Sequence, residues 1–306
     1  MQSALERVPP RRVAATGSVR ARKTADAVAT VVLWAMASSI ILLLAAFLIY
    51  MVYLGASAIS PAFLFGMPKE TEAGGGIGPE IYNSFYILVL TLVFTIPIAL
   101  SAGIYLQEYA RPGLFRGVVQ FSAESLATIP SIVMGLFGLL VFIYFFKWHF
   151  NALAGALTLT LLNLPALMRV TQEALASIPD TLREASMALG GTKWQTITRV
   201  VLPSAIGRLT TGVVLVAGRI FGETAALIFT AGLSVPRNNP YDLNPFRTAE
   251  TLSVHLWYTH SESIVPDVDR IGNGSALVLL VMVLLFNVGA RVAGRALTKR
   301  FTGRAS

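Results

Sequence analysis

The sequence contains no cysteine and little charge, and each of these absences narrows the class of protein. Without cysteine, disulfide bonds, thiolate nucleophiles and cysteine-based metal sites are excluded. Only 13% of the 306 residues are charged whereas 55% are hydrophobic, a balance outside the range of ordinary soluble domains. The composition therefore predicts an integral membrane protein.

Charged residues are absent from five long stretches, namely 27–68, 81–107, 125–146, 148–168 and 271–290. Each stretch is long enough for a helix to cross ~30 Å of hydrocarbon. A sixth apolar stretch, 203–232, contains only Arg208, Arg219 and Glu223 as charged residues. We therefore predict an all-α membrane protein whose helical domain, 29–297, has six transmembrane helices over residues 29–54, 81–106, 125–147, 151–172, 203–231 and 275–296.

The distribution of positive charge predicts the topology. The N-terminal arm (residues 1–28), the second and fourth connections with their helix ends, and the C-terminal tail hold 18 of the 24 Lys and Arg residues. By the positive-inside rule, both termini face the cytoplasm and the long connection 233–274 lies outside. No basic patch interleaved with aromatic residues is present, so the net charge of +8 indicates topology and not nucleic-acid binding.

The basic arm carries no nucleotide-binding loop. The stretch "GSVRARKT" at 17–24 matches a phosphate-binding loop only in its first Gly and its final Lys-Thr, because Arg22 stands where the second glycine is needed. The sequence also shows no large soluble domain. We expect the chain to have no catalytic site and to bind no cofactor of its own.

Prolines interrupt the predicted spans at Pro97, Pro130 and Pro165. Each removes a helical hydrogen bond, which at membrane depth is tolerated mainly where protein or a water-filled cavity covers the freed backbone. These breaks favour a transport pathway over a passive anchor.

The connection 233–274 is unusually long and carries five acidic residues and an apolar, aromatic segment, "TLSVHLWYTH". A loop of this length is typical of function, so it is either a docking or gating surface or an interfacial packing segment. His255 and His260 lie in it, five residues apart, without an acidic neighbour or third ligand in the sequence. We therefore predict no metal site.

A short helix is predicted between the fourth and fifth spans, over residues 180–190. Asp180 or Thr181 is a suitable N-cap, Glu184 would close a capping box with Thr181, and Gly190 suits the end of the helix. Such a helix is too short to be stable alone in water.

One face of this helix is apolar, because Leu182, Ala185 and Leu189 recur at helical spacing. Either this face docks into a groove of another protein, or it packs under the helices of its own chain.

The same region resembles the EAA signature of ABC importer permeases. The spacing of that signature is matched throughout, by Glu184-Ala185-Ser186, Gly190, Val200 and Leu202-Pro203, with Ser for Ala and Val for Ile as the departures. The resemblance implies a type I ABC importer permease fold in which residues 180–190 form the coupling helix that sits in a cleft of the ATP-binding subunit.

Further stretches narrow the resemblance to the A subunit of phosphate-specific ABC transporter permeases (PstA). They are "GGIGPEIYNS" at 75–84, "TIPSIVMGLFG" at 128–138 and "RIFGETAALIFTAG" at 219–232, with Ala226 departing from the family's usual proline. The resemblance implies a bacterial inner-membrane location and import of inorganic phosphate. It also implies several partners: a second, PstC-like permease, a PstB-like ATPase dimer that uses ATP and Mg, and a PstS-like extracytoplasmic phosphate-binding protein.

Arg219 and Glu223 are the predicted substrate-path residues, with Thr224 beside them and Arg169 as a weaker candidate. A charge at the bilayer midplane is costly, so such residues face a cavity or the bundle interior. Glu223 follows Arg219 by four residues and would neutralise it on the same helix face. Gly218 and Gly222 would let another helix approach. Alternatively, Arg219 and Glu223 form a buried ion pair that only fixes packing.

Three other functions remain compatible with the sequence. The first is transport of sulfate, molybdate or phosphonate in the same manner, although the Gly-Glu-Thr-Ala stretch with its Arg favours phosphate. An ion-gradient-driven anion transporter would show an internal repeat or a carboxylate relay, and Glu223 is the lone acid deep in a span. A non-transporting assembly or sensor subunit would tolerate mutations in 184–203.

Overall fold

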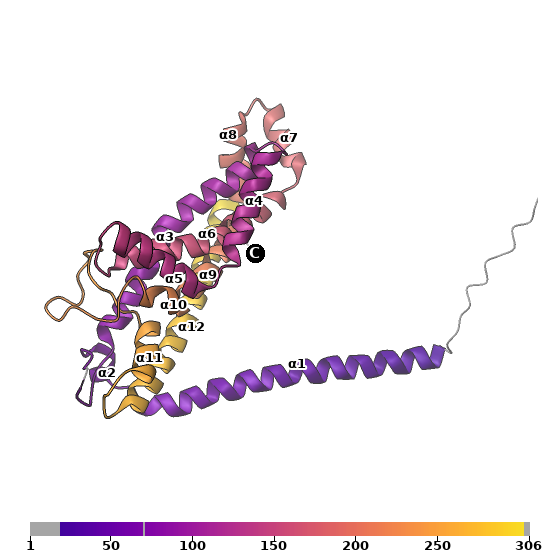
Figure 1. Ribbon diagram of the computed structural model, residues 1–306. Helices are drawn as coiled ribbons and strands as arrows, with labels where there is room; N and C mark the ends of the chain where they lie inside the picture. Colours follow the sequence, from indigo (N-terminus) through magenta and orange to yellow (C-terminus); the bar gives the residue numbers. More distant parts are fainter. Residues whose placement is uncertain (1–18, 70, 303–306) are drawn as a thin grey trace, which may run out of the picture. The chain divides into compact units, whose positions relative to one another are not determined.

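The computed structural model describes residues 19–69 and 71–302, which form helices joined by loops with no strand among them. The chain divides into two units, Met1–Val52 and Tyr53–Ser306, and each is described by itself. Most of the predicted basic arm lies outside the described residues. Its last part, from Val19, already belongs to helix α1 (Val19–Gly55), which is drawn in indigo in Figure 1.

Helix α1 carries no charged residue after Asp26. Its apolar side chains are distributed around the whole helix, as expected for a helix surrounded by lipid or by other protein. It includes the predicted span 29–54.

The second unit is a bundle built around one central helix. Helix α6 packs against α3 and α9, and α9 also packs along α12. Leu159, Leu162 and Leu167 of α6 are buried in the core between these helices. The helices of this unit are α2 (Pro61–Phe65), α3 (Gly78–Ile104), α4 (Leu114–Ala127), α5 (Ser131–Gly138), α6 (Ala152–Ala176), α7 (Asp180–Ala188), α8 (Lys193–Thr196), α9 (Leu202–Gly222), α10 (Ala225–Ile228), α11 (Leu252–Ser261) and α12 (Val268–Thr302).

Among the described residues, five helical segments are long and apolar enough to cross a membrane: Ala21–Ala58, Gly78–Tyr109, Ala152–Ala176, Lys193–Gly222 and Val268–Ala296. The number rises to six if the bent pair Leu114–Ala127 and Ser131–Phe145 counts as one span. This agrees with the predicted all-α membrane fold.

The predicted prolines affect the helices differently. At Pro130 the chain turns by 102° between α4 and the segment Ser131–Phe145, so the predicted span 125–147 is not one straight helix. Pro97 and Pro165 lie inside α3 and α6, which continue past them. Among these three prolines, only Pro130 lies where the chain turns from one helix to the next.

The fifth predicted span, 203–231, is a single helix only as far as Gly222. Glu223 has extended backbone angles (φ −72°, ψ 124°), and the short helix α10 follows it. The apolar run in the sequence concealed this break, because hydrophobicity alone does not mark where a helix ends.

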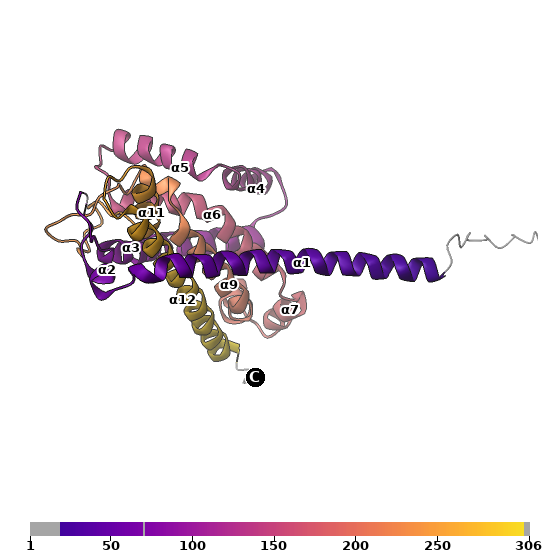
Figure 2. The same ribbon diagram turned by 90° about the horizontal axis from the view of Figure 1, so that it is seen from below.

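The second unit has two distinct ends (Figures 1 and 2). Helices α7 and α8 lie at one end, whereas α2 and α11 lie at the other. Asn151 starts α6 by accepting a hydrogen bond from the Ala154 amide, and Pro79 occupies the first turn of α3. The sequence thus contains recognisable start signals for α3 and α6.

Candidate functional site

Helix α9 presents one exposed stripe along its length. The opposite side is buried, with Leu209, Val216 and Ile220 packed inward. The exposed positions recur every three or four residues, as one helix face requires. They are Ser204, Arg208, Thr211, Leu215, Arg219 and Gly222.

Arg219 lies on this stripe, three residues before the helix ends. No hydrogen bond or ion pair involves its side chain among the described residues, and the predicted pair with Glu223 is not formed. Because Glu223 lies beyond the end of α9, it does not continue the helix face of Arg219. Its Oε1 instead accepts a hydrogen bond from the Ala226 amide (3.3 Å), and its carbonyl accepts one from Ser253 (2.9 Å).

The predicted close helix approach at Gly218 and Gly222 is not seen within the described part of the chain. A methyl group added at Gly218 would lie 3.5 Å from Asn287 of α12, an ordinary contact, and one at Gly222 would meet nothing within 4 Å. The tight contact of α9 is at Gly212, where the added carbon would lie 2.4 Å from Val170. Gly222 therefore lies on an open surface.

The other predicted path residues occupy separate places. Thr224 follows Glu223 and bonds to the Gly222 carbonyl (3.4 Å). Arg169 lies on α6 and forms an exposed ion pair with Glu173 one turn away (2.7 Å). Thr224 thus lies just after the end of the helix that carries Arg219, whereas Arg169 is paired within its own helix.

The predicted capping of α7 by Asp180 or Thr181 is wrong. The N-cap is Pro179, which has no side chain able to accept a hydrogen bond. The helix ends as predicted near Gly190, which has a positive φ of 84° that favours glycine. A capping box is present, but it lies one helix later, between Thr192 and Gln195 at the start of α8.

Arg183 attaches α7 to the rest of the unit. Its guanidinium bonds to the Glu108 carboxylate (2.9 Å) and to the backbone oxygens of Leu175 (2.8 Å) and Ile178 (2.7 Å). Lys193 donates to the Glu108 carbonyl and lies over the ring of Tyr109. Sequence reasoning missed Arg183 and Glu108, because no local pattern links residues 75 positions apart.

The apolar face of α7 is exposed in this chain. Leu182 is 42% exposed and Leu189 is 90% exposed, and Glu184 and Ala185 are exposed as well. Ser186 faces inward and shares a hydrogen bond with Thr196 (2.9 Å). Within the described residues, therefore, this face does not pack under the chain's own helices.

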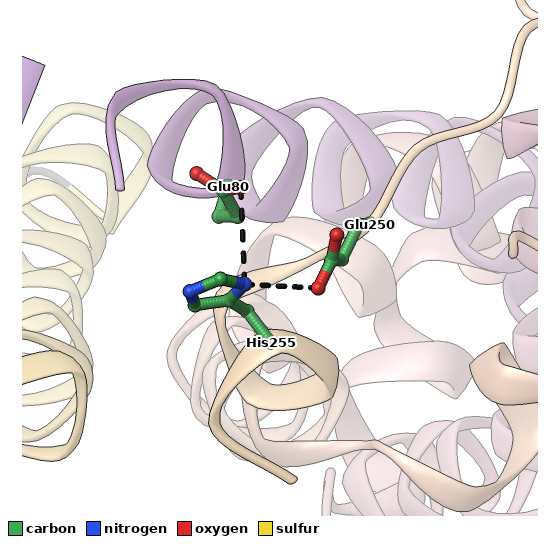
Figure 3. Close-up of side chains that lie close together, drawn as sticks. All are labelled: Glu80, Glu250 and His255. Carbon is green, nitrogen blue, oxygen red and sulfur yellow. Dashed lines mark hydrogen bonds and ion pairs between the residues drawn. The ribbon is translucent and has the colours of Figure 1, made fainter. Parts of the chain in front are cut away.

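The opposite end of the unit holds a buried cluster of Glu80, Glu250 and His255 (Figure 3). Glu80 lies in the first turn of α3, Glu250 precedes α11 and His255 lies in α11. The ring Nδ1 of His255 is 2.9 Å from Glu250 Oε1 and 3.9 Å from Glu80 Oε1. Sequence reasoning gave His255 no acidic partner, whereas the fold brings to it both Glu250, five residues earlier, and the distant Glu80.

The two carboxylates act on the titration of His255. Burial lowers the pKa of its imidazole, but the hydrogen bond to Glu250 and the negative charges of Glu80 and Glu250 outweigh burial. The pKa of His255 is therefore raised above its usual value. Within the described residues, these three side chains are also a group with the donor types and spacing to hold a metal ion.

Long apolar helices, a broken span and an exposed apolar face on α7 are features of a helical membrane transport subunit. The family of "binding-protein-dependent transport system inner membrane component" proteins matches residues 95–303, which is most of the chain. The protein belongs to this family of multi-pass inner-membrane permeases.

Sequence relatives agree with the resemblance found in the motifs. The chain is 41% identical over 290 residues to the "probable ABC transporter permease protein YqgI" of Bacillus subtilis, covering 92% of this chain and 99% of that protein. It is 35% identical over 225 residues to the "phosphate transport system permease protein PstA" of Yersinia pestis, covering 74% of each. The predicted likeness to PstA is thereby confirmed.

Solved structures share the fold. A bacterial alginate ABC transporter, crystallised with an alginate-bound periplasmic protein, contains a chain that aligns with a TM-score of 0.66 at 18% identity, covering 90% of this chain and 96% of that one. A chain of the MetNI methionine ABC transporter aligns with a TM-score of 0.55 at 21% identity, covering 70% and 94%. These likenesses establish the type I importer permease fold.

Proposed function

We propose that this chain is the A-type permease subunit of an ATP-driven importer of inorganic phosphate, with Arg219 lining the anion's route. The observation that carries the proposal is that Arg219 is exposed and has no partner among the described residues, on an otherwise mostly apolar helix. The identity with PstA of Yersinia pestis, which covers three quarters of the chain, supports phosphate as the anion.

An arginine at membrane depth needs a compensating partner. Insertion of one costs roughly 2.5 to 3.5 kcal/mol, so an Arg side chain in a span faces a water-filled cavity, another subunit or a ligand. A guanidinium offers planar, bidentate hydrogen bonding that suits an oxyanion such as phosphate. Since Glu223 is engaged with the Ala226 amide, Arg219 is available to an anion or to the second permease.

Arg169 is a weaker candidate for the same route. It is exposed but already paired with Glu173, and it lies close to the α7 end of α6, where a long side chain reaches the headgroups. We expect it to influence phosphate access less than Arg219 does. Thr224, next to the break after α9, would provide a hydroxyl near the route.

Helix α7 would couple this chain to the ATPase. Its exposed Leu182, Ala185 and Leu189 form a shallow apolar surface of the kind that a groove on a partner accepts. Arg183 and Ser186 hold the other side of α7 onto the permease, so force applied to α7 reaches α3 and α9. In this view Leu202 and Pro203, at the start of α9, complete the coupling region.

The complete importer would contain a second, PstC-like permease, a PstB-like ATPase dimer on the cytoplasmic side and a PstS-like binding protein outside. This chain would supply half of the pore, with both termini in the cytoplasm, while the ATPase uses ATP and Mg. ATP-driven closure of the ATPase dimer would pull on α7 and move the spans between inward-facing and outward-facing arrangements.

Uptake of radiolabelled phosphate into proteoliposomes tests this function. The vesicles would contain the chain with its copurifying partners, with or without ATP, and with excess unlabelled sulfate as a competitor. ATP-dependent uptake that is indifferent to sulfate supports the phosphate importer. Competition by sulfate would indicate a broader oxyanion importer, and uptake driven by an ion gradient without ATP would overturn the proposal.

A further inference from the structure

The cluster of Glu80, Glu250 and His255 has no role in the proposed route, yet its groups are costly to bury. Glu80 is fully buried, and neither of its carboxylate oxygens has a hydrogen-bond partner in the described structure. Both carboxylates approach the same ring nitrogen of His255 (Figure 3). Buried polar oxygens without a hydrogen-bond partner are costly, and a bound ion would satisfy them.

Two buried carboxylates face a single imidazole. His255 Nδ1 is within hydrogen-bond distance of Glu250 (2.9 Å) but not of Glu80 (3.9 Å). Arg247 is also buried at this end, but it donates to Asn83 and to the backbone oxygens of Asp242 and Thr248. Within the described residues, the chain's own hydrogen bonds therefore leave both Glu80 oxygens unsatisfied.

We infer that Glu80, Glu250 and His255 form the binding site of one divalent transition-metal ion, for which Zn²⁺ is the best match. A doubly charged ion balances both carboxylates while His255 is neutral and ligates through Nδ1. The ion would take the place of the proton that His255 and Glu250 now share.

The donor geometry suits such an ion. Donors around a tetrahedral Zn²⁺, with bonds of about 2.0 to 2.1 Å, lie about 3.3 Å apart. The separations from His255 Nδ1 of 2.9 Å to Glu250 and 3.9 Å to Glu80 bracket this value. All three donor atoms lie within 4.8 Å of one another, so small side-chain shifts bring them to one ion.

The donor types favour zinc over the hard cations. Imidazole nitrogen with carboxylate oxygens is a common zinc set, whereas Ca²⁺ takes six to eight oxygen ligands. A cavity of about 260 Å³ adjoins the cluster and is lined by Glu250 and His255 among others. It gives the ion access from outside and leaves room for a water molecule as the fourth ligand.

The ion would act as a strut between distant parts of the sequence. Glu80 lies in the first turn of α3, whereas Glu250 precedes α11 and His255 lies within it, about 170 residues later. The same region is already linked by hydrogen bonds from Asn83 to the Glu250 carbonyl and from the Leu252 amide to Ser84. The metal would complete this junction and fix α11 against the start of α3.

Metal analysis of the full-length protein tests the inference. The protein, purified in detergent with its copurifying partners, would be stripped with chelator, and Zn²⁺ binding would be titrated against a chromogenic competitor, with metal content measured by mass spectrometry. We expect one Zn²⁺ per chain, bound at least about tenfold more weakly in Glu80→Gln and in His255→Gln. His260→Gln is the matched control, because His260 lies on the same helix but is exposed and bonds only to a backbone oxygen.

A measurement on the wild type guards against variants that fail to fold. Co²⁺ added to the stripped protein should give the strong visible absorption of a four-coordinate site, and Zn²⁺ but not Ca²⁺ should displace it. Equal Zn²⁺ binding by Glu80→Gln and wild type would overturn the inference. So would the weak spectrum of six-coordinate Co²⁺, or a loss of binding in His260→Gln as large as in His255→Gln.

Discussion

The carboxyl groups of Glu108 and Glu80 lie at opposite ends of the helical unit, and they differ in their hydrogen bonding. Glu108 accepts a hydrogen bond from Arg183, and Lys193 bonds to its carbonyl. Glu80 has no bonded partner for either carboxylate oxygen within the described structure. At the α7 end a side chain of the protein bonds to the carboxylate, whereas at the α11 end the described part of the chain leaves both oxygens of Glu80 without a hydrogen bond.

This difference distinguishes polar groups that stabilise the fold through bonds within the chain from polar groups that would bind an ion, a substrate or another subunit. A buried ion pair that is fully bonded is a structural tie, and breaking it is costly. A polar group without a hydrogen bond among the described residues, such as Glu80 in the buried cluster or Arg219 on α9, indicates an ion, a substrate or another subunit. The following predictions test that distinction.

The largest effect is expected for Arg183→Leu, which leaves Glu108 buried without its cation. We expect a loss of about 3 to 5 kcal/mol in the free energy of unfolding. Denaturation of the purified protein, followed by tryptophan fluorescence, measures it. The control is Asp180→Asn, which removes the exposed partner of the same arginine and should cost at most about 1 kcal/mol. Equal losses in both variants would show that Glu108 is not held by Arg183.

Zinc should stabilise the wild type but not Glu80→Gln. At a free Zn²⁺ concentration one hundred times the dissociation constant, the gain is about 2.7 kcal/mol. In chelator the substitution should be neutral or stabilising, because it removes a buried acid that has no partner. Thermal unfolding of both proteins with zinc and with chelator measures the effect. A stabilisation of the same size in both proteins would place the ion elsewhere.

Arg219→Gln should lower ATP-dependent phosphate uptake at least about tenfold, which corresponds to roughly 1.4 kcal/mol. The stability should change by no more than about 0.5 kcal/mol, because Arg219 is exposed and unpaired in this chain. Arg219→Lys keeps the charge but loses bidentate bonding, so partial uptake is expected.

Arg208→Gln is the matched control for Arg219→Gln. Arg208 lies on the same exposed stripe of α9 but near the α7 end, where its charge reaches the headgroups. Unchanged phosphate uptake is expected. If Arg208→Gln and Arg219→Gln reduced uptake equally, the effect would reflect general charge loss and not a specific anion contact.

The smallest effect is expected for Leu189→Ser on the exposed face of α7. Removal of an exposed apolar anchor should weaken binding of the ATPase by about 1 kcal/mol, or about fivefold. The fold should be unaffected, since Leu189 is 90% exposed. Pull-down titration of the ATPase on the immobilised permease measures the affinity, and Thr181→Ala, also exposed on α7, is the control. An unchanged affinity would argue against docking through this face.

The sequence predicted those features that depend on local composition. Runs without charge marked the long apolar helices, and Pro130 marked the break in the third span. Gly190 marked the end of α7. The long helices follow from the cost of burying charge in a membrane. The break at Pro130 follows from its missing amide hydrogen, and the end of α7 follows from the positive φ of Gly190. Each of these causes lies within one short segment of the sequence.

The features that the sequence did not predict depend on residues far apart. Glu80 and His255 meet only because α11 packs against the start of α3, and Arg183 reaches Glu108 only because α7 folds back onto the end of α3. The missed end of α9 has another cause. Glu223 suits a helix by propensity, but its carboxylate bonds to the Ala226 amide and its carbonyl to Ser253, and these contacts favour an extended residue.

Between α8 and α9, residues Ile197–Val201 form a π-helical turn, and another lies at Tyr105–Tyr109, next to Glu108. Such a turn holds one residue more than an α-helical turn. If it moves along the helix by one position, the side chains it passes rotate by about 100° without loss of the helix. The turn before α9 thus contains one residue more than an α-helical turn needs, so a pull on α7 and α8 can be absorbed by a shift of this turn, without breaking the helix that carries Arg219.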